Sequence, residues 1–289
     1  MNGFLNLNKP EGVSSRTVVD RVVEWFPGVK AGHGGTLDPL AEGVLVVALG
    51  QGARLIPFIQ EQPKVYESTW ELGATSPTDD RDGTITRQPV AQPPSAELVR
   101  ALLARFVGVV EQVPPTFSAA RVSGQRAYKL ARRGTPVDLE SRPVRIDRLE
   151  CRRYEFPWLE VEVACGKGTY IRALARDVGQ ALDCGACVQR LIRTAVGPFR
   201  LAETLPWDAD AETARKHVRP LLAAVEHLPR LTLSAEMLWR LRHGQKPVSP
   251  PDLAGWVAVL DDDGQLSVLA EARVAERQLV PRMVFQSDS

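Results

Sequence analysis

The segment AGHGGTLDPLAEGVL, residues 31–45, places a single carboxylate in a glycine-rich loop directly ahead of an apolar run. The carboxylate is Asp38, and the apolar run extends from Val44 to Leu49. Glycines allow tight turns and a close approach of the backbone to a ligand, and a buried apolar run is a rigid strand that anchors such a loop. The pattern predicts that a loop anchored on a rigid strand presents the Asp38 carboxylate, with His33 beside it. A turn or helix-capping role ahead of Pro39 is the alternative, and the two roles are compatible.

Strand and helix patterns interleave irregularly outside this loop. This arrangement predicts an α+β fold with a mixed sheet rather than a doubly wound one. One helix is expected to begin after Ser14 or Ser15, and two more are expected to cover residues 96–106 and 169–182. The expected strands cover residues 5–8, 44–49, 66–72, 144–152, 159–164 and 191–199.

A domain boundary is expected near Leu228-Pro229, after a connector that contains Pro206 and Pro220. Beyond it, residues 235–242 read as a helix, and two apolar runs flank Asp263-Gly264, which is a strong hairpin signal. The sequence therefore predicts a large domain over residues 1–227 and a small β-rich domain over residues 228–289.

The composition is that of a globular chain, with 44% hydrophobic and 25% charged residues in 289. No apolar run is long enough to span a bilayer, and the first ten residues lack the pattern of a signal peptide, so a cytoplasmic location and no membrane partner are expected. Cys184 and Cys187 form a C-x-x-C pair, but no second pair at comparable spacing completes a zinc site. We expect no metal and four reduced thiols.

Basic residues concentrate between Arg121 and Arg153. This segment contains ten Lys and Arg but four Asp and Glu, in a chain of net charge +1. Residues 121–143 are expected to form a basic, helical hairpin-like insertion. Such a concentration is typical of an electrostatic contact with nucleic acid, and a solvated surface is the alternative. The side chains assigned to RNA binding in this insertion are Arg126, Lys129, Arg132 and Arg133.

Residues 31–45 closely resemble the active-site loop of the tRNA pseudouridine-55 synthase family, the bacterial type that needs no guide RNA. Gly34 is a departure, since the family more often has threonine there. Further segments follow in the family's order, and in one of them Phe117 stands where tyrosine is usual. These segments are KVY at 64–66, QVPPTFSA at 112–119, GKGTYIR at 166–172 and LIRTAVG at 191–197.

The resemblance implies a role for one residue in each of several segments. Asp38 would be the catalytic nucleophile, Tyr66 would stack on a flipped base and take part in proton removal, and Leu191 would pack under the target ring. Arg172 lies in the first turn of its helix, where the dipole disfavours a cation unless an anion such as Asp38 compensates it. The alternatives are ordinary core positions for Tyr66 and Leu191, and a surface ion pair for Arg172.

Three more residues are assigned to substrate binding by the resemblance. His33 would fill the space that the flipped base leaves, Asp80 would orient the site, and Tyr170 would contact RNA beside Arg172. A histidine that bonds within its own turn is the alternative for His33.

The resemblance also implies the fold, the reaction and the partners. The fold would be the pseudouridine synthase catalytic fold on a mixed, largely antiparallel sheet with flanking helices, followed by a PUA-like domain that binds RNA or has a purely structural role. The reaction would convert the T-loop uridine at position 55 of tRNA into pseudouridine after base flipping, and it is redox-neutral, so no cofactor is expected. A monomer without guide RNA is expected. The alternatives are a non-catalytic RNA-binding protein or tRNA-folding chaperone, and a pseudouridine synthase acting on another RNA.

Overall fold

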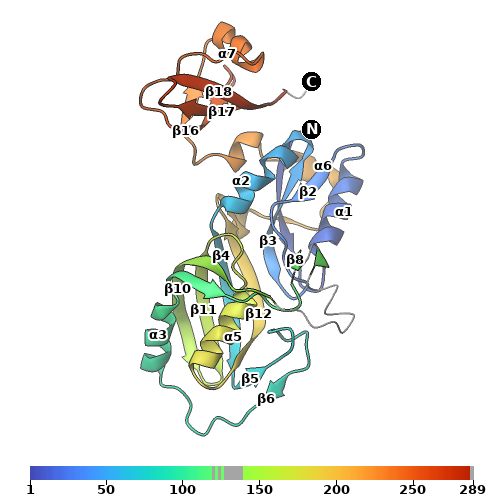
Figure 1. The fold of residues 1–289 in the computed structure, drawn as a ribbon. Helices are drawn as coiled ribbons and strands as arrows, with labels where there is room; N and C mark the ends of the chain where they lie inside the picture. The colour runs from blue at the N-terminus through green and yellow to red at the C-terminus, as the bar shows by residue number, and fades with distance from the viewer. Residues whose placement is uncertain (119–120, 123–124, 127–138, 287–289) are drawn as a thin grey trace.

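A mixed sheet forms the centre of the molecule in the computed structural model, which describes residues 1–118, 121–122, 125–126 and 139–286. Within these residues ten strands form the sheet, and eight of them lie along its main path (Figure 1). In spatial order these are β14 (Leu205–Pro206), β1 (Gly3–Lys9), β3 (Glu42–Leu49), β12 (Ala186–Val196), β4 (Lys64–Leu72), β11 (Trp158–Cys165), β10 (Arg142–Glu155) and β7 (Gly108–Gln112).

Two short strands complete the sheet from its sides. The strand β2 (Ala31–His33) pairs with β3, and β13 (Phe199–Arg200) pairs with β12. Most neighbouring strands are antiparallel, while β1 with β14 and β12 with β3 are parallel. The predicted α+β class with a mixed, largely antiparallel sheet is therefore confirmed.

Three helices cover one face of this sheet and enclose the larger core. They are α1 (Ser15–Trp25), α3 (Ala96–Arg105) and α5 (Ile171–Ala181). In α1 the buried apolar residues follow helical spacing, and the Ser14 side chain caps the helix by accepting from the Thr17 N–H at 3.0 Å. The helix α5 is the one that matters for the site, because its first turn lies against the Asp38 loop.

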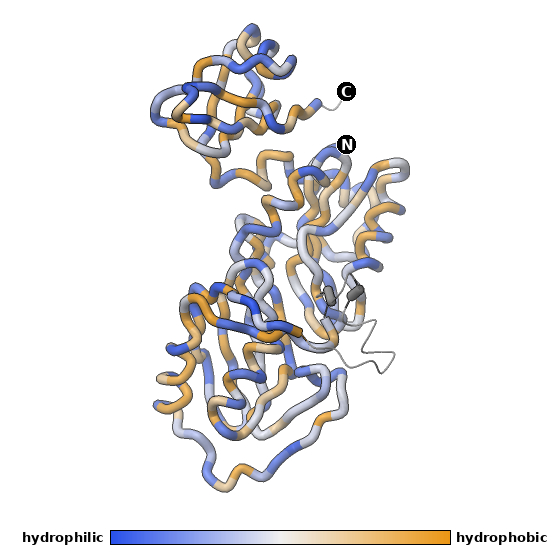
Figure 2. Tube along the Cα trace, in the orientation of Figure 1, coloured by the Kyte–Doolittle hydropathy of each residue, from blue (hydrophilic) through white to orange (hydrophobic). Residues whose placement is uncertain are grey.

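The opposite face of β1 and β3 packs on shorter elements. These are the 3-10 helices η1 (Gly50–Leu55), η2 (Leu201–Glu203) and η3 (Leu221–Ala224) and the helix α2 (Ile56–Glu61). The short helix α6 (Ala211–Lys216) packs instead on the larger core through Ala214. A second core cluster joins Phe4, Val46 and Phe199 to Leu269 and Phe285 near the C-terminus. Hydrophobic stretches accordingly follow the strands of both sheets in Figure 2. None of the helices in the described part of the chain is long and apolar enough to cross a bilayer.

The C-terminal residues build a separate four-stranded sheet, drawn in orange to red in Figure 1. Its strands β16 (Gly255–Leu260) and β17 (Leu266–Arg273) form the predicted hairpin, with Gly264 in the left-handed region at φ 74°. The remaining elements are β15 (Arg230–Thr232), β18 (Gln278–Val284) and α7 (Ala235–Arg242). A β-rich C-terminal unit is therefore confirmed, while the division at residue 228 stays a prediction.

One local prediction was wrong within the described residues. The insertion was expected to be helical, but at residues 121–126 β8 (Arg121–Val122) pairs with β9 (Gln125–Arg126) as two antiparallel strands. The Ser123-Gly124 dipeptide between them is a turn signal, which helical periodicity alone does not register. Lys129, Arg132 and Arg133 lie outside the described residues. A further pair of short strands, β5 (Ala74–Thr75) and β6 (Thr86–Arg87), flanks the loop at residues 76–85.

Of the turn and the helix start considered for Asp38-Pro39, the turn is confirmed. The N–H of Ala41 donates to the carbonyl of Asp38 at 3.1 Å, which closes a four-residue turn. Proline is favoured at the second position of such turns, so the same dipeptide serves a turn rather than a helix.

Candidate active site

The Asp38 loop connects β2 to β3 and is fastened at its base by Ser15. The Ser15 hydroxyl accepts from the backbone N–H of Leu37 at 2.8 Å and donates to its carbonyl at 2.9 Å. Ser15 is buried in the first turn of α1, so this pairing ties the loop to the helix. Asp38 therefore lies on backbone that is held on both sides.

Lys9 supports the same loop from beneath. Its ammonium group donates to the carbonyls of Val13 at 2.7 Å, Pro10 at 2.8 Å and Pro39 at 3.3 Å, and the residue is fully buried. Burial lowers the pKa of Lys9 to about 8, and the negative charge of Asp38 opposes part of that shift. Lys9 therefore links the turn that presents Asp38, through Pro39, to the segment between β1 and α1, through Pro10 and Val13.

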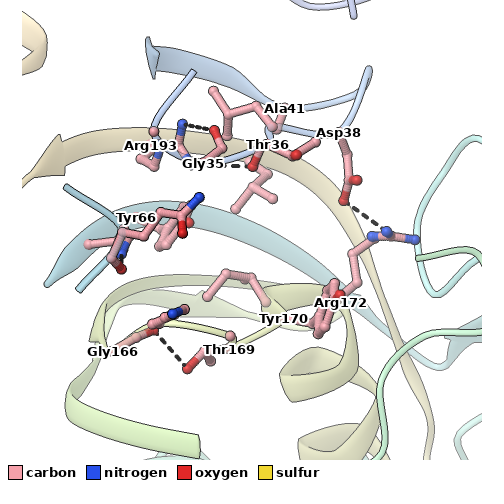
Figure 3. Close-up of a pocket in the computed structure, with 18 of the residues that line it drawn as sticks. Gly35, Thr36, Asp38, Ala41, Tyr66, Gly166, Thr169, Tyr170, Arg172 and Arg193 are labelled. Carbon is pink, nitrogen blue, oxygen red and sulfur yellow. Dashed lines mark hydrogen bonds and ion pairs between the residues drawn. The ribbon is translucent and has the colours of Figure 1, made fainter. Parts of the chain in front are cut away.

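Arg193 of β12 holds the other half of the loop. Its guanidinium donates to the carbonyls of Val44 at 2.8 Å, Gly35 at 3.1 Å and Thr36 at 3.3 Å (Figure 3). Gly43 allows the backbones of β3 and β12 to lie close together here, because a Cβ at this position would lie 2.3 Å from the backbone carbonyl oxygen of Arg193. The loop is thus tied to the sheet by a buried cation.

Arg172 points from α5 toward Asp38, as Figure 3 shows. Its Nη2 lies 2.8 Å from Asp38 Oδ2 and its Nη1 lies 3.3 Å from Asp80 Oδ2. The guanidinium also donates to the carbonyls of Thr78 at 2.8 Å and Phe117 at 3.0 Å. The Arg172 side chain is 4% exposed and that of Asp38 is 35% exposed, so the arginine is a fixed element and the carboxylate faces open space.

Asp80 supports Arg172 from the side away from the pocket. Its Oδ1 accepts from the Thr78 hydroxyl at 2.6 Å and from the Asp82 N–H at 3.1 Å. Asp80 is 3% exposed, and burial raises the pKa of its carboxyl group against the opposing effect of these bonds and of Arg172. Asp80 therefore fixes Arg172 without facing the pocket.

A pocket of about 700 Å³ opens beside Asp38. This volume lies within the range of small-molecule sites. Tyr66, Leu191 and Tyr170 contribute apolar walls, and the Arg142 guanidinium lies over the Tyr170 ring at 5.1 Å. Burial raises the pKa of Tyr66, and the positive charge of Arg193 opposes that rise. The site thus combines one open carboxylate with a partly apolar cavity.

Comparison with known proteins assigns this site to a family. Residues 24–171 match the TruB family pseudouridylate synthase N-terminal domain, and residues 172–228 match the tRNA pseudouridylate synthase B C-terminal domain. The chain belongs to the TruB family. A relative from Stutzerimonas stutzeri named tRNA pseudouridine synthase B is 39% identical over 97% of this chain and 96% of its own length. One of the same name from Cereibacter sphaeroides is 43% identical over 84% and 83%.

Solved structures share the fold of this TruB family chain. A chain from the structure of an H/ACA RNP bound to a substrate RNA containing 2′-deoxyuridine superposes with a TM-score of 0.76. The match covers 99% of this chain and 85% of the other at 23% sequence identity. The predicted pseudouridine synthase fold is confirmed by this similarity.

The predicted site residues divide into two groups. Asp38, Tyr66, Tyr170, Arg172 and Leu191 all line the pocket, as their motifs suggested. His33 does not line it and lies in β2 opposite Val47 of β3, and Asp80 lies behind Arg172. The backbone of Arg126 belongs to β9, but its side chain is outside the described part, as are the other basic residues assigned to RNA.

Sequence reasoning missed several residues that build the site. Lys64 lines the pocket, and its ammonium group donates to the carbonyl of Gln62 at 2.7 Å and to that of Gln60. Burial lowers the pKa of Lys64 to about 8. Lys9 and Arg193 were missed in the same way, because a sequence does not show which cations are buried. A signal existed for Lys64 and Arg193, which lie inside the quoted KVY and LIRTAVG segments.

The described residues contain no cluster of three or more His, Cys, Asp or Glu side chains arranged to hold a metal ion. Cys165, Cys184 and Cys187 are buried free thiols, and Cys151 is half-buried. Burial raises the pKa of the Cys165 and Cys187 thiols to about 11. These thiols are consequently protonated at neutral pH and behave as small apolar side chains.

Proposed function

We propose that this chain converts the T-loop uridine at position 55 of tRNA into pseudouridine, with Asp38 as the nucleophile. The relatives named tRNA pseudouridine synthase B support the reaction and the class of RNA. The observation that carries the proposal is the open carboxylate of Asp38, which buried Arg172 holds at 2.8 Å beside a pocket with aromatic and apolar walls. A carboxylate in that position meets the requirement for covalent catalysis on a base that has left its stack.

The walls of the pocket suit a flipped pyrimidine. A base in a folded RNA loop is stacked and must rotate out before its ring can react. Tyr66 offers an aromatic ring and Leu191 an apolar side chain, and both are buried around the cavity. Stacking on such groups repays part of the cost of unstacking the base. The pocket therefore favours the flipped state of the target uridine.

The reaction needs no oxidant or reductant. The N1–C1′ bond breaks, the uracil turns, and a C5–C1′ bond forms, while C5 loses a proton and N1 gains one. A covalent bond to Asp38 retains the intermediate, and its cleavage restores the carboxylate. Tyr66 can take the C5 proton only as a phenolate, which has first given up its own proton. Burial raises the pKa of Tyr66 and opposes that ionisation, and the positive charge of Arg193 favours it.

Asp80 acts in this scheme as a positioning residue, since it contacts Arg172 and not the pocket. His33 is proposed to enter the RNA loop in the space that the base leaves, from its place at the end of β2 beside the Asp38 loop. Both roles require that the Asp38 loop keep its shape while RNA binds. The contacts of Lys9 and Arg193 with that loop supply this rigidity.

The remaining RNA contacts are proposed for two surfaces. The basic insertion at residues 121–153 is proposed to bind backbone phosphates of the T-arm. Residues 228–289 are proposed as a PUA-like domain that contacts the RNA farther from the target base. The protein is proposed to act in the cytoplasm as a monomer without guide RNA, because the chain itself carries both surfaces.

Tritium release from a T-arm stem-loop labelled at C5 of its uridines tests this proposal. Formation of the C5–C1′ bond must expel the label, so wild-type protein should release tritium only from a stem-loop with uridine at position 55. The matched control is the same stem-loop with cytidine at that position. Release from neither RNA, or equal release from both, would reject the proposed substrate.

A further inference from the structure

Gln112 lies at the end of β7 and is 2% exposed, outside the residues that line the pocket. Its carboxamide faces the backbone of Tyr170, which precedes the first residue of α5. Gln112 Oε1 accepts from the Tyr170 N–H at 2.8 Å, and its Nε2 donates to the Tyr170 carbonyl at 3.2 Å. One side chain from a distant strand therefore satisfies both backbone groups of the residue that begins the helix.

This pairing holds the N-cap residue of α5, a helix that has no side-chain cap. Tyr170 occupies the capping position and its own side chain makes no capping hydrogen bond. Gly168 lies two residues before Tyr170, in the left-handed region at φ 86°. Because glycine restricts the backbone little, the turn before the helix does not by itself fix the position of Tyr170. The Tyr170 carbonyl also accepts the first helical bond, from the Leu174 N–H at 3.0 Å. Gln112 consequently fixes the position of the Tyr170 backbone, at which the helix starts.

The first turn of α5 carries two groups of the site. The Tyr170 ring forms a wall of the pocket, and Arg172 two residues later meets Asp38. In a helix, the direction of side chains in the first turn follows from the position of the capping peptide. A displacement of about 1 Å in a reacting group costs about 100-fold in rate. The position of Tyr170 therefore controls the ion pair at Asp38.

The chain segment after Gln112 is bound to α5 at two further points. The Val113 carbonyl accepts from Arg176 at 2.8 Å, and the Phe117 carbonyl accepts from Arg172 at 3.0 Å. Both of these contacts are made by side chains of α5. Of these three contacts, only that of Gln112 is made to the backbone at the start of the helix. It therefore sets the position of the backbone from which the Arg172 and Arg176 side chains extend.

We propose that Gln112 is a positioning residue for the reaction, whose carboxamide sets the N-terminus of α5 so that Arg172 meets Asp38 and the Tyr170 ring closes the pocket. The inference rests on the isomerisation proposed above. Gln112 touches neither the pocket nor the RNA-facing side of Asp38, so its loss reduces the rate of the chemical step and leaves RNA affinity nearly constant. A residue that serves stability alone would instead lower the free energy of unfolding without changing the rate of the folded enzyme.

The substitution Gln112→Glu separates these roles through its own protonation. A neutral carboxyl group can still accept from the Tyr170 N–H and donate to its carbonyl. An ionised carboxylate cannot donate, and its second oxygen repels that carbonyl. Because the position is buried, the pKa of the new carboxyl group is expected above its ordinary value. The rate of the variant relative to wild type should therefore rise as the pH falls.

Single-turnover rates with enzyme in saturating excess over T-arm RNA, from about pH 6 to about pH 8.5, measure this ratio. Gln112→Glu should be slower than wild type by about 10- to 100-fold at the alkaline end and should recover at least about threefold at the acidic end. Its KM for RNA should change by less than about threefold. Gln112→Met, which can neither accept nor donate through oxygen or nitrogen, should be slow at every pH, and it serves as the second variant if Gln112→Glu does not fold.

Gln51 provides a matched control elsewhere in the chain. Its Nε2 donates to the Gln286 carbonyl at 2.9 Å, and its Oε1 accepts from the Gln286 N–H at 3.0 Å, which is the same pairing away from α5. Gln51→Glu should leave the rate and its pH profile within about twofold of wild type.

Three outcomes would overturn the inference. Gln112→Glu and Gln112→Met could match the wild-type rate, the Gln112→Glu ratio could stay flat with pH, or the loss could appear wholly in KM. A wild-type protein that makes no pseudouridine in T-arm RNA would instead reject the proposed function. The two failures are therefore distinguishable in the same series.

Discussion

The guanidinium of Arg172 and the carboxylate of Asp38 meet at 2.8 Å across two different elements, one nearly buried and the other open to a pocket. Arg172 also holds Asp80 and two backbone carbonyls, so its position does not depend on Asp38. This asymmetry means that a ligand can displace or modify the carboxylate while the arginine stays in place. A nucleophile that must leave its ion pair to attack needs such an arrangement.

Replacing Arg172 should therefore impair catalysis severely. Arg172→Ala removes the cation from Asp38, leaves Asp80 buried without it, and frees the carbonyls of Thr78 and Phe117. We expect kcat to fall by at least about 1000-fold, or about 4 kcal/mol. Arg172→Lys keeps the charge but not the planar fork, so it should recover only part of the rate. A fully active Arg172→Ala protein would show that the ion pair has no part in the reaction.

Arg193 should matter for both stability and rate, because it holds the Asp38 loop through three backbone carbonyls. Arg193→Met would leave those carbonyls without their donor and should lower the free energy of unfolding by about 3 kcal/mol, with a slower chemical step in the protein that remains folded. Urea unfolding and single-turnover rates measure the two effects. Arg190→Met is the matched control, since Arg190 on the same strand makes an exposed pair with Glu42 at 3.0 Å. Equal effects at the two positions would contradict the assignment.

The fold was largely predictable from the sequence because its signals are local. Period-two and helical patterns marked the strands and α1, α3 and α5, and Asp263-Gly264 marked the C-terminal hairpin. Asp38-Pro39 left both a turn and a helix start open, and the error in the insertion likewise arose where a short dipeptide supports more than one local structure. Tertiary contacts decide between such alternatives, and a single sequence does not show them.

The site was predictable only where a residue belongs to a distinctive motif. Asp38 and Arg172 were found in that way, and their ion pair was expected from the cation in the first turn of a helix. The roles of Lys9, Lys64 and Gln112 were not predicted, because they depend on burial and on backbone partners up to 58 residues away in the sequence. The strand order that brings those partners together is a property of the whole sheet.

The two buried lysines make a testable contribution to the pH dependence of stability. The pKa of Lys9 and of Lys64 is lowered from 10.5 to about 8 in the folded chain by burial. Between these values the unfolded chain binds more protons than the folded one, so the free energy of unfolding gains up to about 1.4 kcal/mol per pH unit from each group as the pH rises. Below about pH 8 the contribution is constant.

Lys64→Met should remove its share of that slope. The difference in free energy of unfolding between wild type and Lys64→Met, measured in urea at several pH values, should change in favour of wild type as the pH rises from about 8 to about 10. Lys216→Met changes an exposed lysine, with a side chain 68% accessible, and is the matched control. Parallel curves for wild type and Lys64→Met would contradict the burial of a cation at this position.

The basic insertion should act as an electrostatic clamp that reads no base. Neutralising Arg126, Lys129, Arg132 and Arg133 together should raise KM more than it lowers kcat and should flatten the salt dependence of RNA affinity, because each phosphate contact releases condensed cations. Discrimination between a T-arm and a scrambled loop should survive, since phosphates carry no sequence information. Affinities for both RNAs at several salt concentrations decide the matter. An unchanged slope places the RNA elsewhere, and lost discrimination means that the insertion reads sequence.

The central claim is that Asp38 is the nucleophile, and Asp38→Asn tests it most directly. The amide keeps the size of the side chain but lacks the charge needed for attack. Pseudouridine in T-arm RNA should be measured after incubation with saturating variant, beside an RNA-binding assay with the same preparation. We predict no detectable pseudouridine, with affinity within about tenfold of wild type, or about 1.4 kcal/mol. Substantial pseudouridine formation by verified Asp38→Asn protein would contradict the account.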